Sequence, residues 1–175
     1  MSDWKGGALQ KPLCWFNSNQ HLKDNKVKRF KTIDHTPVDV IEHTLKILKQ
    51  HPNLKVHIGT DSQNVGLETV YVSVIAYRFG IRGVHYIYTK EKLPLVRDMF
   101  TRLFDECVRS IDIAEWFTQQ INIKVEIDMD YNQDEFSQSN KLIGATKGWA
   151  VSLGYEVNVK PDIQIATRAA DYHCC

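Results

Sequence analysis

The sequence predicts an α/β protein built on a mixed five-stranded sheet with helices on both faces. Three segments rich in Val, Ile and Tyr follow one another closely at 54–60, 69–78 and 84–90, separated by short polar or glycine-containing turns. This spacing predicts an antiparallel meander. Helical and strand patterns then alternate to the end of the chain, an order typical of strands joined through helices that cover a sheet.

A helix is expected before the first strand. Thr36 is a candidate N-cap, Pro37 a candidate first helical residue, and His51-Pro52 a stop. Between them apolar residues recur at helical spacing: Val38, Ile41, Leu45 and Leu48. Residues 1–35 are expected to form an irregular N-terminal arm, which leaves 36–175 as a single domain with this extra helix.

The elements after the meander follow from the same patterns. We expect a helix over about 95–119, a strand over 122–130, a loop over 131–137, a helix over about 138–153 that stops at Gly154, a strand over 156–160 that ends at Pro161, and a last helix from about 163 with Asp162 as its cap. No internal repeat interrupts this order.

Composition excludes several classes of protein. The 175 residues carry a net charge of +1, so nucleic-acid contact would need a local basic patch. The most basic stretch lies in the arm and is either a solvated surface or such a patch: Lys23, Lys26, Lys28, Arg29 and Lys31. No run reaches the roughly 18 apolar residues of a membrane span. The four cysteines lack the spacing of a disulfide framework, which favours a reducing, cytoplasmic location.

Acidic residues fall at unusual places in the predicted strands. Asp61 closes the strand 54–60 on the same face as His57 and Gly59, because alternate strand residues share a face. In the strand 122–130, Glu126, Asp128 and Asp130 share one face. An exposed or edge strand would explain these three acids. A metal site at the strand ends would explain them equally.

Two helices also place an acid near their packing faces. On the helix 95–119, Glu106 lies on the flank of the apolar stripe and leans toward the sheet. On the last helix, Asp171 follows Ile163 and Thr167 at steps of four, and three small residues permit close approach to the sheet: Ala166, Ala169 and Ala170. The last turn of a helix favours cations, so Asp171 goes against local preference, and such exceptions often mark function.

Four acids therefore come from two strands and two helices: Asp61, Glu106, Asp128 and Asp171. Grouped carboxylates repel and raise one another's pKa values unless a cation lies among them. Hard oxygen ligands suit Mg²⁺ or Mn²⁺. Two such ions can promote hydrolysis of a phosphodiester, which makes this chemistry the favoured hypothesis.

The pattern resembles the ribonuclease H-like superfamily and, more closely, the YkuK-type family of bacterial proteins. The matching segments are IGTDSQ (58–63), EIDMD (126–130) followed by SNK (139–141), and KPDIQIATRAAD (160–171). The similarity spans about 37–172. It implies the ribonuclease H-like fold, with acids on the first strand, the first helix after the meander, the fourth strand and the last helix.

The resemblance implies a divalent-metal-dependent nuclease acting on RNA, an RNA–DNA hybrid or structured DNA. Asp61, Glu106, Asp128 and Asp171 would be catalytic and would bind the Mg²⁺ or Mn²⁺ ions, with Asp130 as a further or replacement ligand for Asp128. Candidate substrate-binding residues border these acids: Ser62, Gln63, Asn140, Lys141 and Lys160. Each of these five has an alternative role as a turn or surface residue. The alternative function is a non-catalytic nucleic-acid-binding or assembly module with the same fold.

Overall fold

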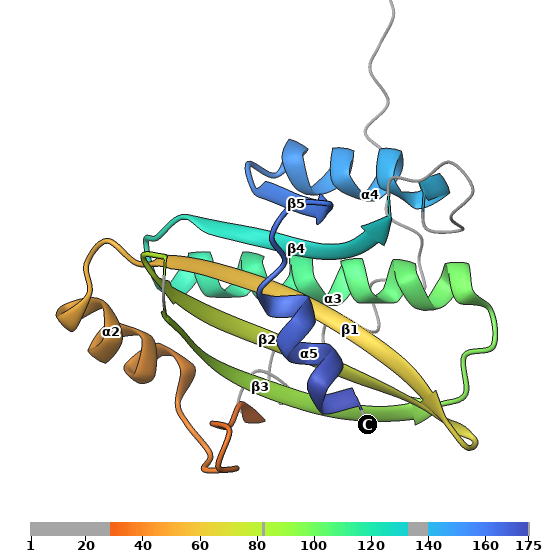
Figure 1. Ribbon diagram of the computed structural model, residues 1–175, viewed down its shortest axis with the longest axis horizontal. Coiled ribbons are helices and arrows are strands. Elements are labelled where there is room, and N and C mark those ends of the chain that lie inside the picture. Colours follow the sequence, from red (N-terminus) through yellow and green to blue (C-terminus); the bar gives the residue numbers. More distant parts are fainter. Residues whose placement is uncertain (1–28, 82, 133–139, 175) are drawn as a thin grey trace, which may run out of the picture.

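The computed structural model describes residues 29–81, 83–132 and 140–174, and its five strands form one sheet in the order β3-β2-β1-β4-β5 (Figure 1). The strands are β1 (Lys55–Val65), β2 (Glu68–Phe79), β3 (Gly83–Pro94), β4 (Val125–Asn132) and β5 (Glu156–Lys160). The first three form an antiparallel meander, whereas β4 runs parallel to β1 and β5 parallel to β4. The predicted fold class is confirmed.

Helices lie on both faces of the sheet. They are α2 (Val40–Gln50), α3 (Met99–Gln120), α4 (Asn140–Ser152) and α5 (Ala166–Cys174). In Figure 1, α5 crosses the near face over β1 and β2, while α3 runs behind the sheet. The apolar core divides in the same way. One cluster joins the sheet to α2, α3 and α4, and a smaller one joins it to α5.

Strand alternation explains how β1 serves both faces. Val56 and Ile58 are fully buried in the larger core, together with Phe117 of α3. Gly59 points to the other face, where a Cβ would come within 2.9 Å of Thr167 Cγ2 and 3.0 Å of Ala166 Cβ. Only glycine permits α5 to lie this close to the strand.

The first helix begins later than the sequence pattern predicted. Asp39, not Thr36, is the N-cap, and its carboxylate accepts hydrogen bonds from the N–H groups of Ile41 and Glu42. An aspartate whose carboxylate reaches two unpaired N–H groups is a strong cap. The prediction that Pro37 starts the helix was therefore wrong, whereas its end next to His51 is confirmed.

β1 extends well past Asp61. The prediction that Asp61 closes the strand, with a short polar turn directly after it, was wrong, because pairing with β2 continues to Val65 opposite Glu68. The turn consists of Gly66 and Leu67, and Gly66 has a φ of 61°. Asp61 therefore projects from the middle of a paired strand, where the backbone holds its position.

The remaining boundaries differ from the predicted ones by a few residues. α3 starts at Met99 behind its N-cap Asp98, and β4 includes Tyr131 and Asn132, which were predicted to be loop. Residues 133–137 of that loop lie outside the described part of the chain. So do residues 1–28, which include most of the predicted N-terminal arm and three lysines of its basic stretch, Lys23, Lys26 and Lys28. Within the described residues, no helix is long and apolar enough to cross a membrane.

The described start of the chain is attached to the sheet. Phe30 is only 1% exposed and belongs to the larger core. Lys31 and Tyr88 of β3 exchange two backbone hydrogen bonds of 2.9 Å. Residues 30 and 31, which were predicted to belong to the irregular arm, thus pack onto the folded domain.

Candidate active site

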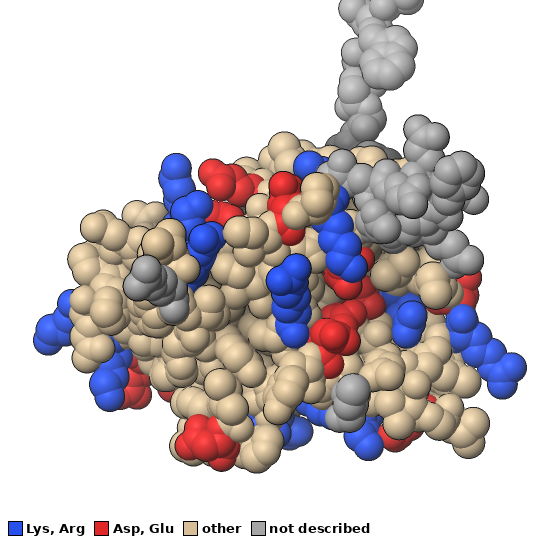
Figure 2. Space-filling view, in the orientation of Figure 1, with Lys and Arg blue, Asp and Glu red and all other residues tan. Residues whose placement is uncertain are grey.

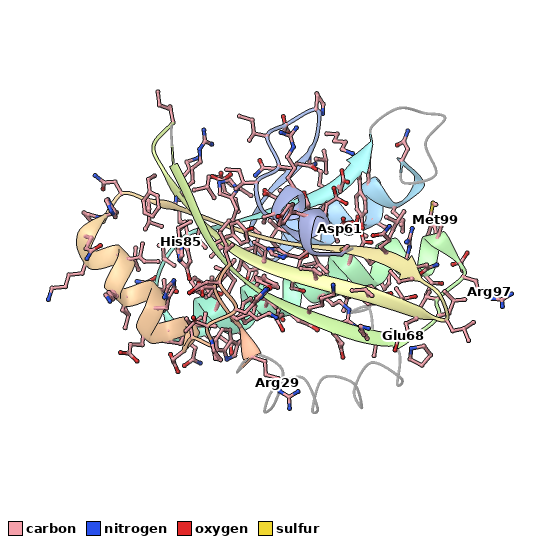
Figure 3. The ribbon with its side chains drawn as sticks, turned by 60° about the horizontal axis from the view of Figure 1, so that its bottom comes forward. Arg29, Asp61, Glu68, His85, Arg97 and Met99 are labelled. Atoms are coloured by element: carbon pink, nitrogen blue, oxygen red, sulfur yellow. The ribbon has the colours of Figure 1, made fainter. Side chains whose placement is uncertain are left out.

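Asp61 lies beside α5 near the middle of the sheet, away from Glu68 and Met99 at one end of the molecule and His85 at the other (Figure 3). It is partly buried, and this burial is the main reason why its pKa is raised to about 6. The negative charges of Asp130 and Asp171 raise that pKa further. Three acids from β1, β4 and α5 are thus close enough to repel one another.

Glu106 approaches the same region from α3. Its side chain is buried, 4% exposed, as the helical stripe predicted. Burial raises its pKa to about 8, and the charges of Asp61 and Asp130 add to the rise. Ser62, a predicted substrate-binding residue, donates a 2.5 Å hydrogen bond to Glu106 Oε1, and its role toward a substrate stays a prediction.

These four residues form what we call the acid cluster: Asp61, Glu106, Asp130 and Asp171. Asp171 is exposed on α5, one turn beyond the buried Thr167. Asp130 is partly buried and forms an ion pair in which Lys160 Nζ lies 2.5 Å from Oδ1. A predicted substrate-binding lysine thus neutralises one member of the cluster.

Asp128, the predicted ligand on β4, has a different environment. It is fully buried, and its Oδ2 accepts hydrogen bonds from the N–H groups of Ile165 (2.7 Å) and Ala166 (2.8 Å). Its Oδ1 accepts one from Asn158 Nδ2 (2.9 Å) and lies 3.1 Å from His57 Nδ1. Asp128 therefore caps α5 from a neighbouring strand, whereas Asp162 had been expected to do so. On β4 it is Asp130, and not Asp128, whose charge contributes to the raised pKa values of Asp61 and Glu106.

The sequence reasoning missed Arg102. It lies one turn before Glu106 on α3, and its charge lowers the pKa values of both Glu106 and Asp61. Its Nη1 is 3.3 Å from the carbonyl oxygen of Ser62, to which it donates a hydrogen bond. The spacing of four residues from Glu106 was the available signal, because residues four apart share a helix face.

The other predicted substrate-binding residues are spread around this region. Gln63 is exposed on β1, two positions beyond Asp61. Asn140 begins α4 and is partly buried. Lys141 belongs to the same helical turn, but its side chain lies outside what the structure describes. Their roles toward a substrate stay predictions.

The acids fit a divalent cation in donor type and charge. Carboxylate oxygens are the preferred ligands of Mg²⁺ and Mn²⁺. The raised pKa values of Asp61 and Glu106 reflect burial and repulsion, which a cation would offset. Among the described residues, however, no three acidic, histidine or cysteine side chains converge closely enough to hold an ion as arranged. Each oxygen of Asp128 already has two polar partners, so an ion could bind Asp128 only by displacing one of them.

A cleft of about 630 Å³ lies at the opposite ends of the parallel strands. Its lining includes Lys55 of β1, Glu126 of β4 and Glu156 of β5, all near the starts of their strands. In open α/β sheets, ligands bind outside the carboxyl ends of the strands. The cleft does not meet that expectation, because it lies at the starts of the parallel strands.

Comparison with known proteins agrees with this architecture. A family model described as Ribonuclease H-like matches residues 39–174. No curated protein matches the chain. The matched range contains every strand of the sheet and all four acids of the cluster.

Proposed function

The chain belongs to the ribonuclease H-like family, in its YkuK-type branch, and from this premise we propose that it is a divalent-metal-dependent nuclease. Membership of this family supports a fold of the kind found in nucleases and other proteins that act on nucleic acids. The observation that carries the finer proposal is the acid cluster, in which β1, α3, β4 and α5 each contribute one carboxylate. Burial and the repulsion between their charges raise the pKa values of Asp61 and Glu106, and a bound cation would offset both effects.

Asp61, Glu106, Asp130 and Asp171 would hold Mg²⁺ or Mn²⁺. The bound ions would supply Lewis-acid stabilisation of the attacking and leaving oxygens of a phosphodiester. Asp61 is fixed by the pairing of β1 with β2, and Glu106 is oriented by the hydroxyl of Ser62. Asp128 would act as a positioning residue, because it holds the start of α5 and so the helix that carries Asp171.

Arg102 and Lys160 supply the positive charge of the site. Arg102 lowers the pKa values of two acids, and Lys160 pairs with a third. A phosphodiester entering the site brings negative charge next to carboxylates, so nearby cations reduce the repulsion. We propose that both side chains contact substrate phosphate oxygens.

Cleavage of end-labelled oligonucleotides tests this function. The substrates are single-stranded RNA, an RNA–DNA hybrid and a four-way DNA junction, each with Mn²⁺, Mg²⁺ or EDTA. We expect metal-dependent cleavage of at least one substrate by the wild type and at least a hundredfold loss in Asp61→Asn. Glu42→Gln, an exposed acid on α2, is the matched control and should cleave normally.

The second candidate function is a non-catalytic nucleic-acid-binding module. It is supported by the failure of three acids to converge among the described residues. Under this alternative, oligonucleotides bind equally with Mn²⁺ or EDTA, none is cut, and Asp61→Asn binds like the wild type. That combination would exclude the nuclease.

A further inference from the structure

A second group of side chains lies beside the acid cluster, where the end of α5 meets the outer strand β3. We call it the α5–β3 platform: Lys31, His35, Tyr86, Tyr88, Lys90, Tyr172 and His173. Its centre is the ring of His173, which stacks on Tyr88 with centroids 3.8 Å apart and an interplanar angle of 8°. Tyr86 supports the same ring, because its hydroxyl lies 3.1 Å from His173 Nε2. These contacts make the platform a packed unit.

Positive charge gathers on this unit. Lys31 Nζ lies 5.0 Å from the centroid of the Tyr88 ring, and Lys90 Nζ donates a 2.8 Å hydrogen bond to the carbonyl of His173. His35 Nδ1 is 2.7 Å from the Tyr88 hydroxyl. The pKa of His173 is lowered, first by burial and then by its electrostatic interactions with His35, Lys90 and Lys31.

Two acids are adjacent to these basic residues in the chain: Asp34 precedes His35, and Glu91 follows Lys90. The carboxylate of Asp34 accepts hydrogen bonds from the hydroxyl groups of Thr32 and Thr36, and that of Glu91 forms an ion pair with Arg109. The platform is therefore a local concentration of basic groups in a molecule whose net charge is only +1. Figure 2 shows basic and acidic side chains interspersed on the face that carries α5, so this positive charge is local.

Tyr172 presents an aromatic ring to solvent next to His173. It is 76% exposed, although its ring meets His173 edge to face at 5.1 Å and 85°. Exposed aromatic rings next to basic side chains are the usual elements of single-strand binding, because every base has a face that can stack. In a duplex those faces are covered by neighbouring bases.

The platform and the acid cluster border the same end of α5. Asp171 directly precedes Tyr172 in the chain. Cys174 is buried at this end of the helix. Burial is the main cause of its raised pKa, the charges of Asp61, Asp171 and Glu106 raise it further, and Lys90 lowers it. A strand bound on the platform would therefore reach the acids within a short distance.

We propose that the α5–β3 platform binds a single-stranded segment of nucleic acid and directs it to the acid cluster. One unpaired base stacks on Tyr172, while Lys31, His35 and Lys90 contact the adjoining phosphates. This inference rests on the proposed function, and it narrows the substrate class to nucleic acids with an unpaired stretch.

Fluorescence anisotropy of the full chain in EDTA, where no metal-dependent cleavage occurs, tests the platform. The probes are a labelled 12-nucleotide RNA and the same RNA in a blunt duplex. We expect the wild type to bind the single strand more tightly. Tyr172→Ala should weaken that binding about tenfold and Tyr172→Phe should not, because stacking needs the ring and not the hydroxyl.

Lys31→Gln should also weaken binding and should reduce the slope of log affinity against log salt by about 0.7, the value for one lost phosphate contact on a single strand. The matched control is Lys46→Gln with Lys49→Gln, two exposed lysines of α2 at the far end of the sheet. These changes should leave binding and its salt dependence unaltered. Thermal unfolding of each variant checks that it folds.

The outcomes separate the two proposals. Equal affinity for duplex and single strand, no binding by the wild type, or unchanged binding by a folded Tyr172→Ala would each overturn the platform. Binding that depends on Tyr172 without any metal-dependent cleavage would support the platform and contradict the nuclease. Metal-dependent cleavage that the platform variants leave unchanged would support the nuclease and contradict the platform.

Discussion

Asp128 and Asp130 lie two positions apart on β4, yet their surroundings differ sharply. Asp128 is fully buried, and two backbone N–H groups at the start of α5 donate to it. Asp130 is partly buried, paired with Lys160, and close enough to Asp61 and Glu106 to raise their pKa values. The two acids therefore have separate tasks, one in holding α5 and the other in the acid cluster.

This division predicts that substitutions of the two acids change the free energy of unfolding by very different amounts. Asp128→Ala should lower the free energy of unfolding by about 3 kcal/mol, because it leaves buried donors without an acceptor. Asp130→Asn should change it by less than about 0.5 kcal/mol. Urea denaturation of both variants gives these values. Equal stability losses in the two variants would contradict the division.

At the scale of elements, the position of α5 depends on Gly59. The helix lies so close to β1 that a Cβ on Gly59 would be 3.0 Å from the backbone nitrogen of Thr167. A backbone atom cannot rotate away as a flexible side chain can. The strand and the helix must therefore separate if this position carries any side chain.

Gly59→Ala should accordingly destabilise the protein by about 1–3 kcal/mol through overpacking. It should also weaken Mn²⁺ binding, since the displaced helix carries Asp171. Gly144→Ala on α4 is the matched control, because its Cβ would have no heavy atom within 4 Å. The control should be neutral or stabilising by up to about 1 kcal/mol. Chemical denaturation and metal titration of both variants check this prediction.

Sequence patterns predicted most elements and missed those features that depend on distant partners. The helical spacing of apolar residues in α3 correctly predicted that Glu106 faces the sheet, because this spacing depends only on the sequence of the helix itself. The length of β1 was underestimated, because Ser62, Gln63 and Asn64 look like turn residues although pairing with β2 continues to Val65. The cap supplied to α5 by Asp128 has no local signal, since it joins residues 37 and 38 positions apart.

At the scale of the whole molecule, the stability of the fold depends on pH through titratable groups on elements far apart in the sequence. His43 of α2 and His85 of β3 face each other with their Nε2 atoms 2.8 Å apart. Burial is the main cause that lowers the pKa of each, and the charges of His85 and Lys46 lower that of His43 further. Both rings are thus harder to protonate in the folded protein than in the unfolded chain.

The unfolded chain therefore binds more protons than the folded protein as the pH falls below about 6.5, the ordinary pKa of histidine. The contribution of this pair to stability is complete above that pH and is lost as the pH falls toward the lowered values.

Asp61 and Glu106 act in the opposite direction, because their raised pKa values make the folded protein bind protons in this pH range. The effect of the histidine pair is therefore measured as the difference in thermal stability between the wild type and the double variant His43→Gln/His85→Gln. That difference should change in favour of the double variant as the pH falls from 7.5 to 5. His51→Gln is the control and should show the pH dependence of the wild type. If thermal stability depends on pH in the same way in this control and in the double variant, the His43–His85 pair is not the cause.

The central claim is that the acid cluster binds a divalent cation. Titration calorimetry with Mn²⁺ near neutral pH tests it most directly, on the wild type, Asp61→Asn and the control Glu42→Gln. We predict saturable binding by the wild type and the control and its loss in Asp61→Asn, because the change removes a carboxylate charge from the middle of the cluster. No saturable binding by the wild type, or equal binding by Asp61→Asn, would contradict the account.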